Sequence, residues 1–145
     1  MSTNLHKIFA TDTQAEQEGR EVEVTDGVHF RVRSQNSDRV RKWSSRRSKK
    51  NRKYLVGNGE IPIKVQDEDE ISMVCEVLVV GWRGVKDAEG KDIAYSTEAC
   101  RKLMTELPPL RRQIILLSAL EETFRKEETE AIVGNSPTPS GQPTG

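Results

Sequence analysis

Two stretches near the start of the chain alternate apolar and polar residues with the period of two that is typical of β-strands. Residues 21–24 and 28–33 flank residues 25–27, which we interpret as a three-residue hairpin loop with Gly27 at the left-handed position. The register that follows has one apolar face and one face of opposite charges. It pairs Val24 with Val28, Val22 with Phe30, Glu21 with Arg31 and Glu23 with His29.

After this hairpin, apolar residues become sparse. We predict a helix from residue 38 to residue 54, with few apolar positions and a cap supplied by one of residues 36–38. Residues 57–59 and Pro62 then interrupt the chain. The alternation of apolar residues over 61–65 predicts a short further strand.

A longer amphipathic helix is predicted from residue 67 onward. Its first turn would hold the acidic run of residues 67–70, because the helix dipole favours negative charge there. An apolar stripe follows at spacings of three and four residues. The stripe consists of Ile71, Val74, Cys75, Leu78, Val79 and Trp82. Gly81 and Gly84 flank Trp82 and let the chain leave the helix, so we interpret residues 81–90 as a structural joint that places Trp82 in the core.

Two more helices are predicted toward the C-terminus. Ser96 or Thr97 caps the first, and Pro108-Pro109 ends it and starts the second, because proline is tolerated in a first turn. The second helix has an apolar arc wider than one face, so we expect it to meet a deep core or another chain. The arc consists of Leu110, Ile114, Ile115, Leu116, Leu117, Ala119, Leu120 and Phe124. Since this arc exceeds what a small monomer leaves in water, we predict self-association.

Together these elements predict an α+β fold in which an N-terminal β-hairpin is followed by a mainly helical body. We divide the chain into a flexible N-terminal arm over residues 1–18 and a single α+β domain over residues 19–133. Residues 134–145 are rich in Pro and Gly and have nothing to bury, so we predict a disordered C-terminal tail.

The composition indicates one small intracellular protein. The chain has 145 residues with 34% hydrophobic and 32% charged side chains, which allows a modest core. No apolar run reaches the roughly 18 residues of a membrane span, and the N-terminus lacks the features of a signal peptide, so we expect a soluble protein. We interpret Cys75 and Cys100 as partly buried free thiols in a reducing cytosol, with a disulfide as the alternative.

No group of residues indicates an enzyme. The glycines of residues 57–59 are not followed by the Lys and the Ser or Thr of a phosphate-binding loop. His6 and His29 lie far apart, and the cysteines lack the spacing of zinc ligands. A helical first turn would spread the carboxylates of residues 67–70 outward, away from a single metal ion. We therefore expect no catalytic residue, no cofactor and no metal.

The strongest charge feature is the basic segment, residues 39–53, which holds nine Lys or Arg and no acid although the net charge of the chain is zero. Such a helix can neutralise phosphates, and Trp43 or Tyr54 could stack on bases, so nucleic-acid binding is one interpretation. No recognition fold accompanies the segment, and its cations can pair instead with residues 67–70 or with a neighbouring subunit. We favour a protein-facing or solvated surface and expect no specific nucleic-acid binding.

Several short motifs follow one another in a characteristic order along residues 8–133. They are an N-terminal segment with Phe9, Asp12, Glu16, Glu18 and Gly19, the hairpin, the segment Gly81-Trp82-Arg83-Gly84-Val85-Lys86-Asp87-Ala88-Glu89-Gly90, the segment Tyr95-Ser96-Thr97-Glu98, the pairs Leu103-Met104 and Leu107-Pro108, and the final helix. In this order and spacing the chain resembles the tail assembly chaperones of long-tailed, siphovirus-type bacteriophages.

The resemblance implies a small α+β protein without enzymatic activity that acts in the host cell cytoplasm during virion morphogenesis. Such chaperones bind the long helical tape measure protein, keep it soluble and help to recruit the tail tube subunits that polymerise around it. The chain departs from the family in its dense basic segment and its Pro- and Gly-rich ending. Two other functions stay open: a structural tail or connector component retained in the virion, and a small nucleic-acid-binding regulator that uses residues 39–53.

The candidate interface residues are apolar side chains of the joint and of the last helix, together with cations of the basic segment. They are Trp82, Ile114, Ile115, Leu116, Leu117, Leu120 and Phe124, with Arg46, Arg47, Lys49 and Lys50. The expected partners are the tape measure protein, the tail tube protein and further copies of this chain, and no membrane is expected.

Overall fold

The computed structural model describes residues 4–126, which form an α+β fold, as the sequence predicts. In chain order the elements are α1 (Leu5–Phe9), α2 (Thr13–Glu18), β1 (Arg20–Thr25), β2 (Val28–Val32), α3 (Asp38–Asn51), η1 (Arg52–Leu55), α4 (Ile63–Ser72), η2 (Met73–Leu78), β3 (Val79–Arg83), α5 (Thr97–Glu106), α6 (Pro108–Ala119) and η3 (Glu121–Phe124). The turns η1 and η3 are 3₁₀-helical, and η2 is π-helical. The predicted disordered tail, residues 134–145, lies outside the described residues.

The predicted β-hairpin is present, and most of its register is confirmed. The confirmed pairs are Val22 with Phe30, Glu21 with Arg31 and Glu23 with His29. The predicted pairing of Val24 with Val28 is wrong, because Thr25 lies opposite Val28 and the ladder shifts between Glu23 and Thr25. A two-residue turn, with Gly27 at φ 79°, fits the twist of the strands better than the predicted longer loop. The extra residue is absorbed as an irregularity in β1.

The chain around Trp82 is a strand, which corrects the predicted helix. The preceding helical segment ends at Leu78 with η2, and β3 then pairs antiparallel with β2 to give the sheet order β1-β2-β3. The spacing of Val79 and Trp82 fits a helical stripe, but the edge of β2 offers backbone hydrogen-bonding groups that need partners. Pairing with that edge places Trp82 opposite Phe30.

Trp82 nevertheless has the structural role that the joint was expected to give it. Its ring centroid lies 5.5 Å from that of Phe30 and 5.1 Å from that of Tyr95, both in edge-to-face arrangements. Its Nε1–H donates a 2.7 Å hydrogen bond to the backbone of the loop after β3. Gly84, at φ 80°, is required because a Cβ there would lie 2.0 Å from the carbonyl oxygen of Gly27.

The acidic run lies later in its helix than predicted. Because α4 starts at Ile63, the predicted strand over residues 61–65 is wrong, and residues 67–70 occupy the middle and last turns of the helix. Three alternating residues were too few to distinguish a strand from a helix that starts after a proline. The helix dipole gives these carboxylates no advantage here, and arginines of other helices balance them instead. The ion pairs are Asp67 and Glu70 with Arg111, Glu68 with Arg101, and Asp69 with Arg47.

The other predicted helices are confirmed, with sharper boundaries. Ser37 caps α3 by accepting a hydrogen bond from the N–H of Val40, and Ser96 caps α5 in the same way. Proline occupies the first two positions of α6, as expected. The last helix ends at Ala119, and the short turn η3 carries the chain to Phe124.

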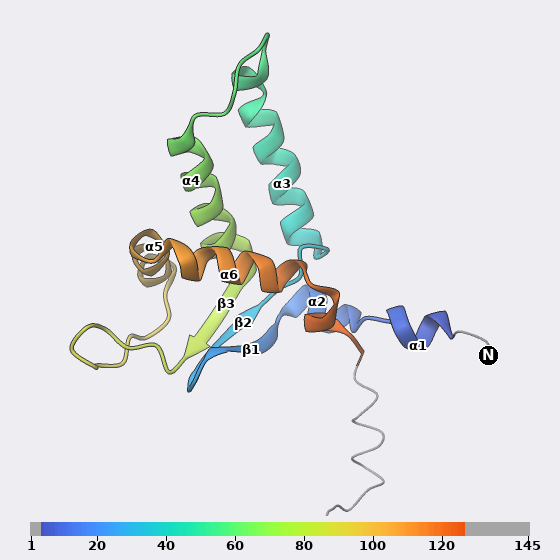
Figure 1. Ribbon diagram of the computed structural model, residues 1–145, viewed down its shortest axis with the longest axis vertical. Coiled ribbons are helices and arrows are strands. Elements are labelled where there is room, and N and C mark those ends of the chain that lie inside the picture. The colour runs from blue at the N-terminus through green and yellow to red at the C-terminus, as the bar shows by residue number, and fades with distance from the viewer. Residues whose placement is uncertain (1–3, 127–145) are drawn as a thin grey trace, which may run out of the picture.

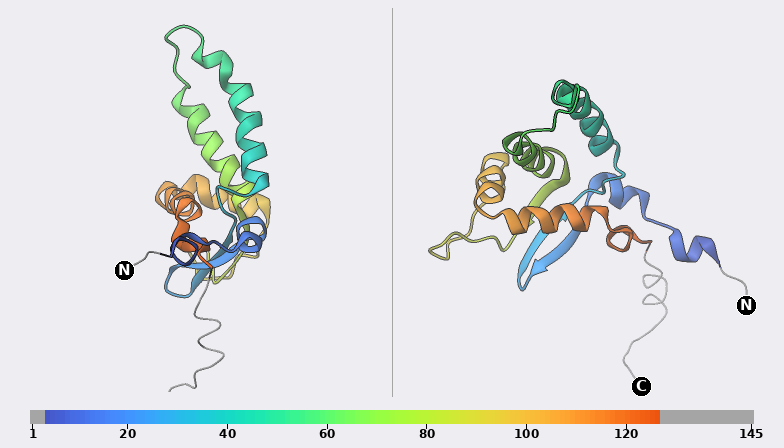
Figure 2. Two further views of the ribbon diagram at one scale, coloured as in Figure 1. Left: turned by 90° about the vertical axis from the view of Figure 1, so that its right-hand side faces the viewer. Right: turned by 45° about the horizontal axis from the view of Figure 1, so that its top comes forward.

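The helices α3 and α4 extend away from the rest of the molecule as a projecting hairpin. Figure 1 shows their connection at the far end from the sheet, and both views in Figure 2 agree. The strands, η2, α5 and α6 form the body, in which α6 passes over the sheet (Figure 1). Such an extended element presents most of its surface to solvent.

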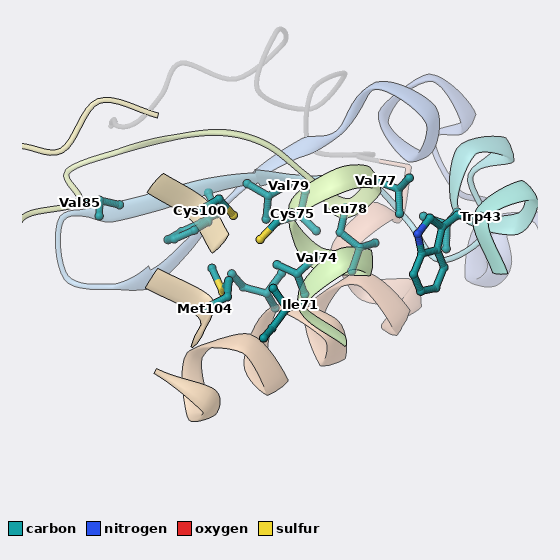
Figure 3. Close-up of a cluster of buried hydrophobic side chains, with 14 residues drawn as sticks. Trp43, Ile71, Val74, Cys75, Val77, Leu78, Val79, Val85, Cys100 and Met104 are labelled. Atoms are coloured by element: carbon teal, nitrogen blue, oxygen red, sulfur yellow. The ribbon is translucent and has the colours of Figure 1, made fainter. Parts of the chain in front are cut away.

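The hydrophobic core lies where the sheet, η2, α5 and α6 meet. Figure 3 shows side chains of η2 and α5 pointing into it, with Trp43 of α3 at one side. Val74, Leu78 and Met104 are fully buried there. Cys75 and Cys100 lie in the same cluster as free thiols, which confirms the prediction of unpaired cysteines.

The predicted flexible arm, residues 1–18, contains α1 and α2. Asp12 caps α2 and pairs with Arg20 at 3.1 Å. A β-bridge between Thr11 and Arg125 joins the arm to the segment after η3. α1 has no buried residue, so its apolar side chains face solvent.

Candidate partner-binding surfaces

The helix α6 buries one side and exposes the other. Ile114 is 0% exposed and Phe124 is 1% exposed, so these two candidates belong to the core of a single chain. Leu116 is 58% exposed and Leu120 is 40% exposed, and both reach the surface. Ile115 and Leu117 are half-buried. Only the outer edge of the predicted apolar arc is therefore available to a partner.

A buried arginine sets which side of α6 faces inward, and sequence reasoning missed it. Arg111 is 3% exposed, and its Nε donates a 2.9 Å hydrogen bond to Glu70. Its other nitrogens donate to Asp67 at 3.3 Å and to the carbonyl oxygen of Met104 at 3.1 Å. A buried charge without partners would be strongly unfavourable, so the cluster holds α6 in one rotational setting. The available signal was a cation inside the apolar arc.

Four exposed positions of α6 and its C-cap lie at intervals of three and four residues, and we name them the outer stripe; Arg112 and Ala119 are also exposed on this helix. Pro109, Gln113, Leu116 and Leu120 follow one another at intervals of four, three and four residues, and all are exposed. At 1.5 Å of rise per residue the stripe is about 16 Å long. Its length matches roughly three turns of a second helix laid alongside.

The outer stripe begins beside an apolar groove between the β-hairpin and α6, which we name the hairpin groove. It has a volume of about 350 Å³. The hairpin contributes Val24 and Val28, and the helices contribute Leu107 and Leu110. Pro109 and Gln113 also line it, so the groove and the outer stripe form one continuous surface.

A second groove lies between α5 and the loop after β3, and we name it the loop groove. It has a volume of about 690 Å³. Aliphatic side chains and an alanine form its floor: Ile93, Ala99, Leu103 and Leu107. Charged residues line its rim: Asp87, Glu89 and Glu106, with Lys86, which pairs with Asp92, and Lys102. All of these lining residues fall between residues 86 and 107, whereas the hairpin groove joins segments that are distant in the chain.

One cation of the basic segment, Arg47, is half-buried against the neighbouring helix, and the other cations of the segment are exposed. Arg47 pairs with Asp69 and lies 4.8 Å from the ring centroid of Trp43. Within the described residues, the other eight cations of residues 39–53 form no ion pair with an acid. The predicted pairing with the acidic run thus holds for Arg47 alone, while Arg46, Lys49 and Lys50 are exposed.

At the far end of the projecting hairpin lies an apolar tip that sequence reasoning missed. Leu55 is 55% exposed, Val56 is 76% exposed and Ile63 is 75% exposed. Leu55 ends η1, Val56 follows it and Ile63 begins α4, so the three residues flank the connection between the two helices, which lies at the far end of the hairpin in Figure 1. Exposed aliphatic residues at a projecting end contribute little to the fold and are typical of contact surfaces.

Ion pairs and burial shift several pKa values around these surfaces. A hydrogen bond from Arg101 lowers the pKa of Glu68, and a hydrogen bond from Arg83 lowers that of Glu21. A hydrogen bond with Cys75, together with burial, raises the pKa of Cys100. The neutral thiol of Cys100 is therefore favoured, and the same hydrogen bond lowers the pKa of Cys75.

Neither a metal-binding group nor a membrane-spanning helix is present among residues 4–126. In that range, no three His, Cys, Asp or Glu side chains are grouped so that they could hold a metal ion. None of the helices described there has the length and apolar character needed to cross a membrane.

Comparison with known families adds the origin of the chain. Residues 31–135, more than half of the sequence, match the family described as YdaY prophage protein. The chain belongs to this family. The match covers the projecting hairpin, the loop groove and the whole of α6. It begins after Val24 and Val28, which line the β-hairpin side of the hairpin groove. Neither a curated protein nor a solved structure shows significant similarity to the chain.

Proposed function

We propose that this prophage protein is a tail assembly chaperone, which binds the tape measure protein and helps to recruit tail tube subunits. Its activity is binding, without catalysis. Family membership supports a role in a bacteriophage. The order of sequence motifs along residues 8–133 supports the tail assembly chaperone among the roles a phage protein can have.

The hairpin groove and the outer stripe form one continuous surface, and this surface is the main structural support for the proposal. Amphipathic helices bind by placing side chains at intervals of three and four residues into an apolar groove. The hairpin groove offers such a site, with Val28, Leu107 and Leu110 in its lining. Leu116 and Leu120 extend the contact along α6 by two further turns. A long helical partner fits this surface better than a compact one.

Co-expression with the tape measure protein tests the proposal. The wild-type chain should keep the tape measure protein in the soluble fraction and co-purify with it. Replacing both Leu116 and Leu120 by Asp should raise the Kd of the complex about tenfold or more. Both leucines are exposed and lie in the proposed apolar contact, where a charge would be unfavourable. Val56→Asp is the matched control, since Val56 is also aliphatic and, at 76% exposed, lies at the hairpin tip away from this surface.

Equal co-purification of the wild type and the double variant would overturn the assignment of this surface. Failure of the wild type to bind the tape measure protein would overturn the chaperone function itself. Mass spectrometry of purified particles separates the chaperone from a structural tail component, because an assembly chaperone should be absent or scarce in the finished virion.

The exposed cations of α3 favour a second candidate function, that of a nucleic-acid-binding regulator. Trp43 is only 8% exposed and Tyr54 is half-buried, so neither offers an open ring for base stacking. Any contact would therefore be limited to phosphates and blind to sequence. Tight binding of DNA or RNA at physiological salt that is lost when Arg46, Arg47, Lys49 and Lys50 become Ala would favour the regulator over the chaperone.

A further inference from the structure

Charge is divided unequally between the projecting hairpin and the body. The projecting hairpin, residues 38–72, holds ten Lys or Arg and six acids, a net charge of +4. The body, residues 4–37 and 73–126, holds 13 Lys or Arg and 14 acids, a net charge of −1. Opposite charges on two parts of a molecule favour association in which the positive part of one copy faces the negative part of another.

The tip of the hairpin combines apolar side chains with cations. Leu55, Val56 and Ile63 are all more than half exposed. Arg52, Lys53 and Lys64 flank them, and within the described residues none of these three cations pairs with an acid. A binding surface that fits the tip must offer apolar groups to its aliphatic side chains and acids to its cations.

The loop groove has that character. Its floor is aliphatic, with Ile93, Leu103 and Leu107. Asp87, Glu89 and Glu106 lie on its rim. Lys102 is the opposing cation of the rim, since Lys86 is neutralised by Asp92 at 2.8 Å.

We propose that the hairpin tip of one copy of this chain docks in the loop groove of a second copy. Within one chain the contact is impossible, because the tip projects away from the body while the loop after β3 lies at another side of it (Figures 1 and 2). Each copy has one tip and one groove, so the contact joins two different patches. The inference is independent of the chaperone function, because it involves no tape measure protein.

The test measures self-association of the purified full chain by analytical ultracentrifugation. The wild type should associate with a Kd that rises with salt, because screening weakens the attraction between rim and tip. Val56→Asp with Ile63→Asp should raise that Kd about tenfold or more, since a charged group would face the apolar floor. Leu5→Asp, at a leucine of α1 that is 61% exposed and lies outside the tip and the groove, should leave the Kd unchanged.

Charge variants of the rim test the other half of the contact. Glu89→Lys with Glu106→Lys should weaken association, and Lys102→Glu should strengthen it. A mixture of the tip variant and the rim variant should restore pairing between the two different chains, because the tip variant keeps an intact groove and the rim variant keeps an intact tip. Unchanged melting temperatures show that these surface changes leave the fold intact.

Three outcomes would overturn the proposal. The first is a wild-type chain that stays monomeric up to near-millimolar concentration. The second is self-association that survives both the tip and the rim variants. The third is a mixture of the two variants that fails to pair. The tip variant could also keep self-association and lose an ability of the wild type to bind duplex DNA at physiological salt. That result would show that the projecting hairpin binds nucleic acid and not a second copy.

Discussion

The body and the projecting hairpin are held together in different ways. In the body, apolar side chains such as Phe30, Leu78 and Ile114 are fully buried. In the outer part of the hairpin the contact between α3 and α4 is polar, because Asp69 accepts hydrogen bonds from Arg47 and Asn51. The body therefore depends on apolar burial. The hairpin is anchored at its base by buried side chains such as Trp43 and Ile71, whereas its outer part is joined through the carboxylate of Asp69. The exposed surface that this leaves on the hairpin is what a partner can use.

The largest expected effect is in the body, at Trp82. Trp82→Ala should lower the free energy of unfolding by about 3–5 kcal/mol, because it removes a large ring packed on Phe30 and Tyr95. Denaturant unfolding measures the change, and Trp82→Phe should lose clearly less. An unchanged melting temperature for the alanine variant would show that the ring supports no core contact.

A smaller and local effect is expected in the hairpin, at Asp69. Asp69→Ala leaves Arg47 and Asn51 without their acceptor and should destabilise the hairpin by about 1–3 kcal/mol. Hydrogen exchange should show lost amide protection in α3 and α4 while the strands stay protected. The matched control is Asp92→Ala. Asp92 pairs with Lys86, which is exposed, so this change should lower the free energy of unfolding by less than about 1 kcal/mol. Uniform loss of protection would contradict the separation of the two regions.

Helix caps provide a matched pair across the two regions. Ser37 caps α3 and Ser96 caps α5, each by accepting a hydrogen bond from the backbone N–H three residues later. Either serine to alanine change should lower stability by about 0.5–2 kcal/mol. Ser37→Ala should give the larger loss, because Ser37 is 0% exposed and its loss leaves buried N–H groups unsatisfied. Equal values by denaturant unfolding would show that burial of the cap makes no difference.

The smallest expected effect concerns pH. Arg101 lowers the pKa of Glu68, so the ionised carboxylate stabilises the fold at pH values above the ordinary carboxyl pKa. This contribution is lost as the pH falls through the lowered folded-state pKa. Because the Glu68 side chain is 53% exposed, we expect less than about 1 kcal/mol. Glu68→Gln should reduce the loss of stability between neutral and acidic pH, and an identical pH profile would exclude a role for this pair.

Most of the fold could be predicted because its signals are local. The hairpin register follows from alternating residues and opposite charges, and Ser37, Ser96 and Pro108 mark the starts of three helices. The strand β3 could not be recognised, because Val79 and Trp82 also fit a helical spacing and only pairing with β2 distinguishes the two. The start of α4 was missed for a similar reason, since residues 61–65 are too few to show a period.

The candidate site was predicted less completely than the fold. Leu116 and Leu120 were among the expected surface residues, and both are exposed. Ile114 and Phe124 have the same apolar character but face inward, because the buried ion pairs of Arg111 set the rotation of α6. The hairpin groove joins residues that are distant in the chain, such as Val28 and Leu110, so no local pattern could reveal it. The loop groove lies within residues 86–107, but it depends on how the loop after β3 folds against α5.

Hydrogen exchange of the chain with and without its tape measure protein tests directly whether that protein binds the outer stripe. New amide protection is expected along α6, with the strongest effect between Gln113 and Leu120, and in the β-hairpin beside it. The outer turns of α3, which face away from the hairpin groove, should keep the exchange rates of the free chain. Protection confined to α3 and the hairpin tip, with α6 unchanged, would contradict the claim that the tape measure protein binds the outer stripe.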